Sequence, residues 1–309
     1  MFLPSDPDRV GGDSGRIWMY DYATPGLSDS DALRPLLLTG FDNIPDLHPL
    51  GIDFDAATST LYVISHSRTQ GPVVEIFHIS VADATARHVQ TLKHARLHAP
   101  NAVHVVGAGK LLVTNDHHFR ASVSPLLSKV ETFSGLPGGT VVYIDVHHPS
   151  DAQILARVPF ANGIAMLNAT TAAVASSSKA GIYLYKFHRD TPPSLQFLSY
   201  IRTPAAADNL SVDSEGKLLV SGHPHAPSLM VVAQGRAKCN LAGTHGEQKA
   251  CECSAPSWAA EWSEQGGLNN LYSNDGAEFC SSSTFARDAE RGVSMMSGLY
   301  DSGILVARG

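Results

Sequence analysis

Residues 101–115 read Asn-Ala-Val-His-Val-Val-Gly-Ala-Gly-Lys-Leu-Leu-Val-Thr-Asn, and this stretch shows the unit that decides the fold. It starts with a polar residue, continues as an apolar strand, turns, and returns as a second apolar strand that ends in a polar residue. The same unit recurs in residues 162–176 and 208–223, and more weakly in 51–66. Units repeated at roughly 50 to 60 residues are typical of β-propeller blades, so the sequence predicts an almost all-β propeller.

The rest of the chain also favours strands. We expect further strands at residues 16–22, 36–38 and 73–79, around Tyr143, and at 182–185 and 229–232. Only residues 125–134 look helical, because Ser124 is a favourable N-cap, Pro125 suits the first helical position and Gly135 ends the run. We expect this short helix to form a lid over the mouth of a pocket. An amphipathic helix packed on a loop is an equally good interpretation.

Composition excludes several classes of protein. The 309 residues, 43% hydrophobic and 17% charged, suffice for a sizeable core. A net charge of -7 without any basic cluster argues against a nucleic-acid partner. No stretch approaches the roughly 18 consecutive apolar residues of a membrane span, and residues 1–6 lack the pattern of a signal peptide.

Four cysteines lie in the last quarter of the sequence: Cys239, Cys251, Cys253 and Cys280. Their spacing fits no familiar zinc pattern, so we expect one or two disulfides, with the connectivity open; reduced, inert thiols are the alternative. Asn168-Ala169-Thr170 is a glycosylation sequon, which matters only if the protein is secreted.

Polar residues at the strand ends point to a binding site. If every innermost strand starts at the channel, one pocket is lined by Asn101, Asn115, Asn162, Asp208 and Asn209. Because side chains alternate along a strand, Asp116 points away from Asn115 and can address a second site. Amide and carboxylate oxygens suit calcium. The alternative is that these residues only form turns.

Three motifs in order carry a family resemblance: Asn115-Asp116-His117-His118-Phe119, Phe160-Ala161-Asn162-Gly163-Ile164, and Asp208-Asn209-Leu210-Ser211-Val212-Asp213 with Gly222-His223-Pro224. Together they resemble the serum paraoxonase/arylesterase family, from about Arg16 to Val306. The resemblance implies one six-bladed propeller over residues 1–309. It also implies two calcium ions in the channel and hydrolysis of lactones, aryl esters and, promiscuously, organophosphates.

The resemblance further implies roles for single residues. Asn115, Asn162, Asp208 and Asn209 would bind the catalytic calcium. Asp116 and the backbone carbonyl of Ile52 would bind a structural calcium. The substrate pocket would include Asn101, Phe119 and His223.

The catalytic base is where this sequence departs from the family. The family's proposed base is a pair of histidines; His66 matches one of them, whereas Leu50 stands at the other position. His48 and His117 are the further candidates for catalysis. The family also has an adjacent Glu-Asp pair near its start that binds both ions, but the first glutamate here is Glu75. We therefore expect this chain to lack the family's N-terminal segment.

These observations predict a calcium-dependent hydrolase of lactones and aryl esters, in which water attacks a carbonyl that calcium polarises. One alternative is a propeller that has lost catalysis and acts as a calcium-stabilised binding or structural protein. Another is a gluconolactonase-like or strictosidine-synthase-like enzyme. We expect a small-molecule ester or lactone as the partner. The resemblance and the clustered cysteines suggest a secretory route, while the oligomeric state stays open.

Overall fold

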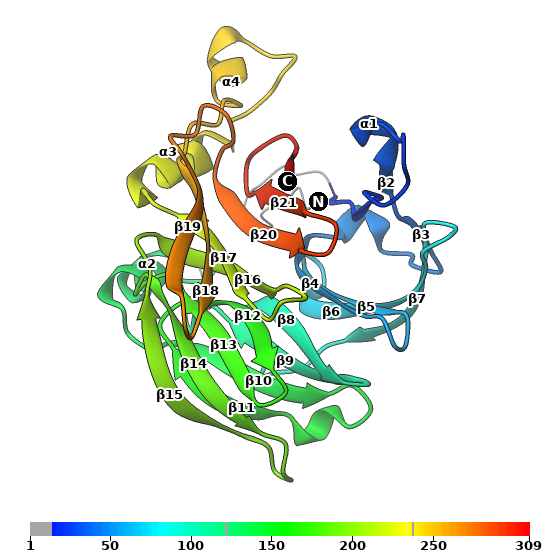
Figure 1. Cartoon of the computed structure of the whole chain (residues 1–309), viewed down its shortest axis with the longest axis vertical. Coiled ribbons are helices and arrows are strands. Elements are labelled where there is room, and N and C mark those ends of the chain that lie inside the picture. The colour runs from blue at the N-terminus through cyan, green and yellow to red at the C-terminus, as the bar shows by residue number, and fades with distance from the viewer. Residues whose placement is uncertain (1–13, 121–122, 237) are drawn as a thin grey trace.

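A computed structural model describes residues 14–120, 123–236 and 238–309. Within these residues, five largely antiparallel sheets surround an axis as the blades of a propeller (Figure 1). The innermost strand of each blade contacts the innermost strand of the next along the series β4, β8, β12, β16 and β20. The all-β propeller predicted from the repeats is therefore confirmed.

The blades follow one another along the chain. The first blade consists of β4 (Pro49–Asp55), β5 (Thr60–Ser67), β6 (Gly71–Ser80), β7 (Thr85–Leu92) and the parallel edge strand β3 (Leu37–Thr39). The second has β8 (Pro100–Gly107), β9 (Lys110–Asn115), β10 (Gly139–Asp145) and β11 (Gln153–Val158). The third has β12 (Ala161–Asn168), β13 (Thr171–Ser176), β14 (Gly181–His188) and β15 (Ser194–Arg202). The fourth has β16 (Ala206–Val212), β17 (Leu218–His223), β18 (Ser257–Ser263) and β19 (Gly267–Asn274), and the fifth β20 (Ser282–Asp288), β21 (Val293–Gly298) and β22 (Ile304–Arg308).

The expected number of blades was wrong: the described residues form five blades and not six. Each repeat unit of the sequence is the inner hairpin of one blade, as expected. The described residues before Pro49, however, supply only strands of three residues. Two of them, β1 (Trp18–Tyr20) and β2 (Leu33–Pro35), form a separate two-stranded sheet, and β3 joins the edge of the first blade. Strands this short do not build a four-stranded blade.

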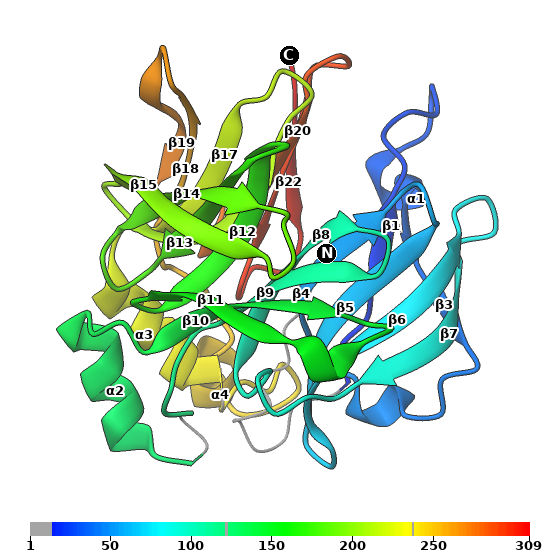
Figure 2. The same ribbon diagram turned by 90° about the horizontal axis from the view of Figure 1, so that it is seen from below.

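In the part of the chain that the structure describes, four short α-helices accompany the sheets: α1 (Asp29–Ala32), α2 (Pro125–Ser134), α3 (Ala226–Arg236) and α4 (His245–Lys249), with 3₁₀ turns at Ile44–Asp46 and Pro149–Asp151. The predicted helix at 125–134 is α2. The predicted strand at 229–232 was wrong, because these residues lie within α3. A short apolar run does not distinguish strand from helix, and this run lies between β17 and β18, which already pair with each other. Figure 2 shows α2, α3 and α4 on one side of the sheets.

Two disulfides confirm the expectation for the cysteines. Cys239 bonds to Cys251 within the connection between β17 and β18. Cys253 bonds to Cys280, which ties this connection to the residue pair that precedes β20. No helix in the described part of the chain is long and apolar enough to cross a membrane.

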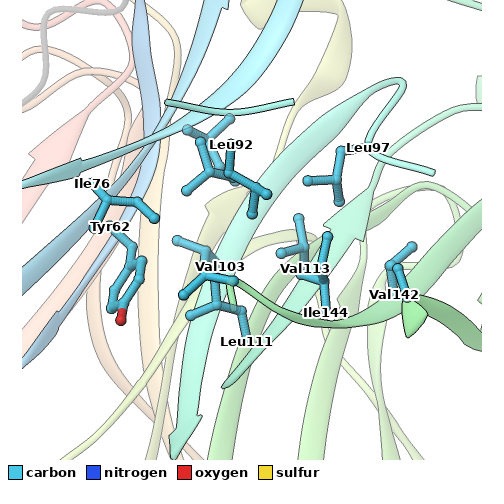
Figure 3. Close-up of a cluster of buried hydrophobic side chains, with 13 residues drawn as sticks. Tyr62, Ile76, Leu92, Leu97, Val103, Leu111, Val113, Val142 and Ile144 are labelled. Carbon is cyan, nitrogen blue, oxygen red and sulfur yellow. The ribbon is translucent and has the colours of Figure 1, made fainter. Parts of the chain in front are cut away.

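Apolar side chains fill the spaces between neighbouring blades. Figure 3 shows the cluster between the first and second blades, where Ile76 and Leu92 gather with Val103, Leu111 and Val113. All five are at most 4% exposed. This dense packing fixes the strand that ends at Asn115.

Hydrogen bonds also join neighbouring blades along the inner strands. In each, a side chain of one blade bonds to a backbone carbonyl of the next. The pairs are His66 Nε2 with Pro100 O, Thr114 Oγ1 with Asn162 O, Ser177 Oγ with Ala207 O and Ser211 Oγ with Phe285 O, all at 2.7 Å. The relative positions of the inner strands are therefore set by specific bonds as well as by apolar packing.

Candidate functional site

A β-bulge interrupts every inner strand near its start. The pairing registers shift there and leave unpaired Leu50–Gly51, Asn101, Asn162–Gly163, Asp208–Asn209 and Ser283. Bulges turn side chains out of the regular sheet and are frequent beside active sites. The bulges of neighbouring blades lie against one another: a Cβ added to Gly51 would lie 2.4 Å from Asn101 O, and one added to Gly163 would lie 2.6 Å from Asn209 Cα.

Most residues predicted for the catalytic pocket lie on this ring of bulges. Asn101, Asn162, Asp208 and Asn209 occupy three of the five, and Leu50 occupies the bulge of the first blade. The arrangement brings polar groups from the second, third and fourth blades to the same end of the inner strands.

One cluster, the Asp208 group, consists of Asn162, Ser177, Asp208 and His223. His223 Nε2 lies 3.0 Å from Asp208 Oδ2, and Asn162 Nδ2 donates to Ser177 Oγ at 3.0 Å. Asn162, Asp208 and His223 are 5 to 8% exposed. Among the described residues, Asn162 Oδ1 and His223 Nδ1 are buried without any hydrogen-bond partner. Because buried polar atoms almost always have partners in folded proteins, two such atoms on the neighbouring third and fourth blades indicate a site built for a ligand.

The contacts of the Asp208 group fix what each free atom can do. A carboxylate oxygen only accepts, so the Nε2–H of His223 donates to Asp208 and Nδ1 carries a lone pair. Asn162 Oδ1 is likewise an acceptor. Neighbouring Asn209 uses its Nδ2 to donate to Ser283 Oγ at 3.2 Å and Thr284 Oγ1 at 3.0 Å, which leaves its amide oxygen out of these bonds. The group thus offers electron pairs to a cation or a proton.

A second cluster, the Asp116 group, consists of Asn101, Asp116, His117 and Thr132. His117 Nδ1 lies 3.0 Å from Asp116 Oδ1, and His117 Nε2 lies 2.7 Å from Thr132 Oγ1 of α2. Asn101 Nδ2 donates to Asp116 Oδ2 at 3.4 Å. Burial alone would raise the pKa of Asp116 and lower that of His117, but their mutual bond and charge outweigh burial, so the pKa of Asp116 is lowered and that of His117 is raised.

The other two predicted catalytic histidines lie at the first blade. His66 directs Nε2–H to Pro100 O and so takes part in the contact between two blades. His48 is 2% exposed, its Nε2 lies 3.3 Å from Asp46 Oδ1, and its backbone N–H donates to Ser65 Oγ. Burial first, and then the charge of Arg68, lower the pKa of His48. Both imidazoles thus have defined structural contacts.

Two predicted calcium ligands have other partners in this structure. Asn115 is fully buried; its Oδ1 accepts the Ala99 N–H at 3.0 Å, and its Nδ2 donates to Arg96 O and Thr140 Oγ1, both at 2.8 Å. Ile52 pairs with Val63 in the sheet, and its side chain is 38% exposed. Asn115 and Asp116 do face different groups, as the alternation of side chains predicts.

The helix α2 shows a feature that the sequence analysis missed. Its polar residues Ser128 and Glu131 are buried, whereas Leu126, Val130 and Phe133 are 73%, 52% and 65% exposed. Glu131 accepts the backbone N–H groups of His118 and Phe119 at 2.8 and 3.0 Å. The spacing of Ser128, Glu131 and Thr132 places these polar residues on one helix face, and this is the signal that could have revealed the contact.

A hollow of about 420 Å³ lies beside the fourth blade. Its lining consists of Pro204, Pro224, Trp258, Leu268, Asn270 and Ser273. Pro224 directly follows His223, but no residue of the bulge ring belongs to the lining.

Comparisons with known proteins agree with the motifs. The family model described as Arylesterase matches residues 9–242. Serum paraoxonase/arylesterase 2 of Canis lupus familiaris is 30% identical over 238 residues, which cover 73% of this chain and 60% of that protein. Serum paraoxonase/lactonase 3 of Oryctolagus cuniculus is 30% identical over 234 residues, covering 74% and 62%. The chain thus spans about three fifths of the length of these relatives.

Solved structures share the fold at low identity. The periplasmic gluconolactonase of Pseudomonas aeruginosa superimposes with a TM-score of 0.50 at 12% identity, covering 96% of this chain and 74% of that one. A chain of the nidogen/laminin complex gives 0.51 at 11%, covering 96% and 90%. These likenesses concern the fold alone. Because the family model matches most of the sequence and the relatives align over about three quarters of it, the chain belongs to the paraoxonase/arylesterase family.

Proposed function

We propose that this protein is a calcium-dependent hydrolase of lactones and aryl esters, and that the Asp208 group is its reactive centre. The observation that carries the proposal is the pair of buried acceptors without partners, Asn162 Oδ1 and His223 Nδ1, of which His223 bonds to Asp208 through its other ring nitrogen. Membership of the paraoxonase/arylesterase family supports the substrate class.

Oxygen atoms of this group fit a calcium ion. Asn162, Asp208 and Asn209 lie on neighbouring bulges and offer amide and carboxylate oxygens, which calcium prefers. Asn115 completes the predicted set, although its oxygen also accepts the Ala99 N–H. When bound there, calcium would act as a Lewis acid on the carbonyl of the substrate.

The Asp116 group gives less support to a second ion. Both carboxylate oxygens of Asp116 already accept bonds from side chains, one from His117 and one from Asn101. Among the described residues, no buried side-chain atom of this group is without a partner. A structural calcium held by Asp116 and the carbonyl of Ile52 stays a prediction, and no step of the mechanism depends on it.

In this proposal, His223 removes the proton of the attacking water. Asp208 orients its ring through Nε2–H, which directs the lone pair of Nδ1 away from Asp208. Because Asp208 and His223 are both buried, the proton transfer would take place away from bulk solvent, where interactions between charges are stronger. His66 is the alternative base, because only its Nε2 is committed to Pro100.

A binding or structural propeller is the second candidate. Leu50 occupies the bulge where the family has a histidine, and His66 and His117 both have structural contacts. In that case the free acceptors of the Asp208 group would bind calcium without turnover.

Hydrolysis of phenyl acetate and of an aliphatic lactone, with added calcium and with a chelator, separates the two candidates. We expect turnover that the chelator abolishes.

Asn162→Ala should weaken calcium binding, measured by calorimetry, by about tenfold, the equivalent of one good ligand contact. Asn168→Ala is the matched control, since Asn168 is an exposed residue at the other end of the same strand. Calcium binding without hydrolysis would favour the binding protein, and unchanged affinity in Asn162→Ala would refute the ligand assignment.

A further inference from the structure

We propose that Glu131 is a positioning residue of the site: its carboxylate clamps the segment from Asp116 to Phe119 and makes α2 a fixed wall of the pocket. The contact between Glu131 and the backbone amides of His118 and Phe119 is called the Glu131 clamp below. Its role in substrate binding rests on the proposed function, whereas its role in holding the segment does not.

The clamp is specific and buried. Glu131 is 5% exposed, and each of its carboxylate oxygens accepts one of two successive backbone N–H groups, at 2.8 and 3.0 Å. Hydrogen bonds that involve a charged acceptor are about twice as strong as neutral ones. The two amides bond to separate oxygens of Glu131, whereas the amide of a glutamine would offer only one acceptor oxygen.

Gly138 gives independent support to this arrangement. A Cβ at this position would lie 1.8 Å from Glu131 Oε1 and 2.4 Å from Glu131 Cδ. The backbone at Gly138 is not in the left-handed region, so its conformation alone does not require glycine. The space is used by the carboxylate of Glu131.

Other contacts hold the same segment from its remaining sides. His98 Nε2 donates to the His117 carbonyl at 2.9 Å, and His117 Nε2 bonds to Thr132 of α2. The ring of Phe119, 41% exposed, packs edge-on against His118 at 4.8 Å. Residues 117–119 are thus fixed between α2 and the blade, and the clamp sets the position of a large aromatic ring that follows directly on Asp116.

The consequence for function is a split between binding and chemistry. Phe119 follows the second blade, and the Asp208 group lies on the third and fourth, so loosening the clamp should disturb the proposed substrate contact of Phe119 and leave the proton transfer intact. A fixed wall also explains why a helix with an apolar exposed face stays in place: its polar face carries the attachment.

The test uses Glu131→Gln, Gly138→Ala and, as a control, Lys129→Gln, which alters an exposed charge on the same helix. Amide hydrogen exchange on the full chain directly measures the protection of the two backbone N–H groups that bond to Glu131. We expect protection at His118 and Phe119 to fall about tenfold or more in both test variants, as for the loss of one charged hydrogen bond, and to stay unchanged in the control.

Steady-state kinetics reads the role in binding. We expect the KM for phenyl acetate to rise several-fold in Glu131→Gln while kcat stays within about twofold, the pattern of lost ground-state binding. Unchanged amide exchange would overturn the clamp, and an equal loss of kcat for all substrates would overturn its role as a wall. If the unmodified protein hydrolyses neither substrate, the proposed function fails, while the exchange measurement still decides on the clamp.

Discussion

Two carboxylate–imidazole pairs in this molecule have the same internal distance and opposite surroundings. Asp116 with His117 and Asp208 with His223 both have N–O separations of 3.0 Å. In the first pair the second ring nitrogen bonds to Thr132, whereas in the second pair it is buried without a partner. Under the proposed function, the pair itself therefore does not mark the reactive centre, and the nitrogen without a partner does.

The same contrast extends to the neighbouring amides. Asn115 has three hydrogen bonds to surrounding groups, whereas Asn162 has a free oxygen although it too is buried. Groups that satisfy each other stabilise the fold, and groups left unsatisfied carry a free-energy cost that a ligand can recover. We therefore expect these groups of the second blade to serve stability and those of the third and fourth blades to serve the chemistry.

Removing the charge of each carboxylate is the strongest test of this division. We expect Asp208→Asn to lower kcat/KM by about 10³-fold, within the range for loss of an oriented base. Asp116→Asn should instead lower the free energy of unfolding by about 2 kcal/mol, because a charged bond to His117 is lost. Phenyl acetate kinetics and urea denaturation of both variants provide the measurement. A larger loss of activity in Asp116→Asn would reverse the comparison.

The next prediction concerns which histidine, His223 or His66, acts as the general base. We expect His223→Gln to reduce kcat by about 10²-fold and His66→Gln by much less, since general-base catalysis is worth at least that factor. If His66→Gln shows the greater loss, the base belongs to the first blade.

The stability of the fold in acid should depend on Asp46, a carboxylate with many hydrogen bonds that lies just before the first blade. Burial opposes ionisation of Asp46, but hydroxyls of Ser67 and Thr69 and the amide of Arg68 lower its pKa well below the ordinary 3.8. Since the folded pKa is lower than the unfolded one, its contribution is present above pH 3.8 and disappears as the pH falls towards the folded value.

The corresponding variant is Asp46→Asn. We expect it to lose about 2 kcal/mol of unfolding free energy at neutral pH and to show a flatter decline in acid than the unmodified protein. Denaturant titrations between neutral and acidic pH test this. Equal slopes in the two proteins would assign acid sensitivity to other carboxylates.

The smallest effect concerns Thr132, which satisfies the second nitrogen of His117. Thr132→Val keeps the shape and removes the hydroxyl, so we expect a loss of about 1 kcal/mol in stability and little change in kcat. Thermal unfolding with parallel kinetics measures both. A gain of hydrolytic activity in this variant would show that freeing the nitrogen is sufficient to create a second reactive pair.

Sequence patterns predicted the strands more reliably than the contacts between them. The hairpins at residues 101–115, 162–176 and 208–223 follow from alternating apolar residues and turns. The number of blades rested on the family resemblance, and the short strands before Pro49 carry no periodic signal strong enough to correct it. The strand predicted at residues 229–232 was wrong because four consecutive apolar residues suit a helix equally well.

For the site, too, the sequence predicted the positions of residues but not the contacts between them. Asn162, Asp208 and Asn209 stand at strand starts that the repeats reveal, so their placement on one ring was predictable. The bond from Asp208 to His223 depends on the pairing of Ala206 with His223, a register that the sequence does not state. The sequence did not predict the Glu131 clamp, because the apolar residues of α2 suggested that its apolar face is buried. In the structure the buried residues of this helix are the polar Ser128 and Glu131.

The ring of bulges has a consequence for evolvability. A residue on a bulge takes no part in the ladder of backbone hydrogen bonds, so strand pairing does not dictate its side chain. The bulges of the first, second and fifth blades therefore offer three variable positions at the same end of the inner strands. A combinatorial library at Leu50, Asn101 and Ser283 would sample new specificities while keeping Asn162, Asp208 and Asn209 constant. Such modularity lets one scaffold acquire new substrates by drift at a few sites.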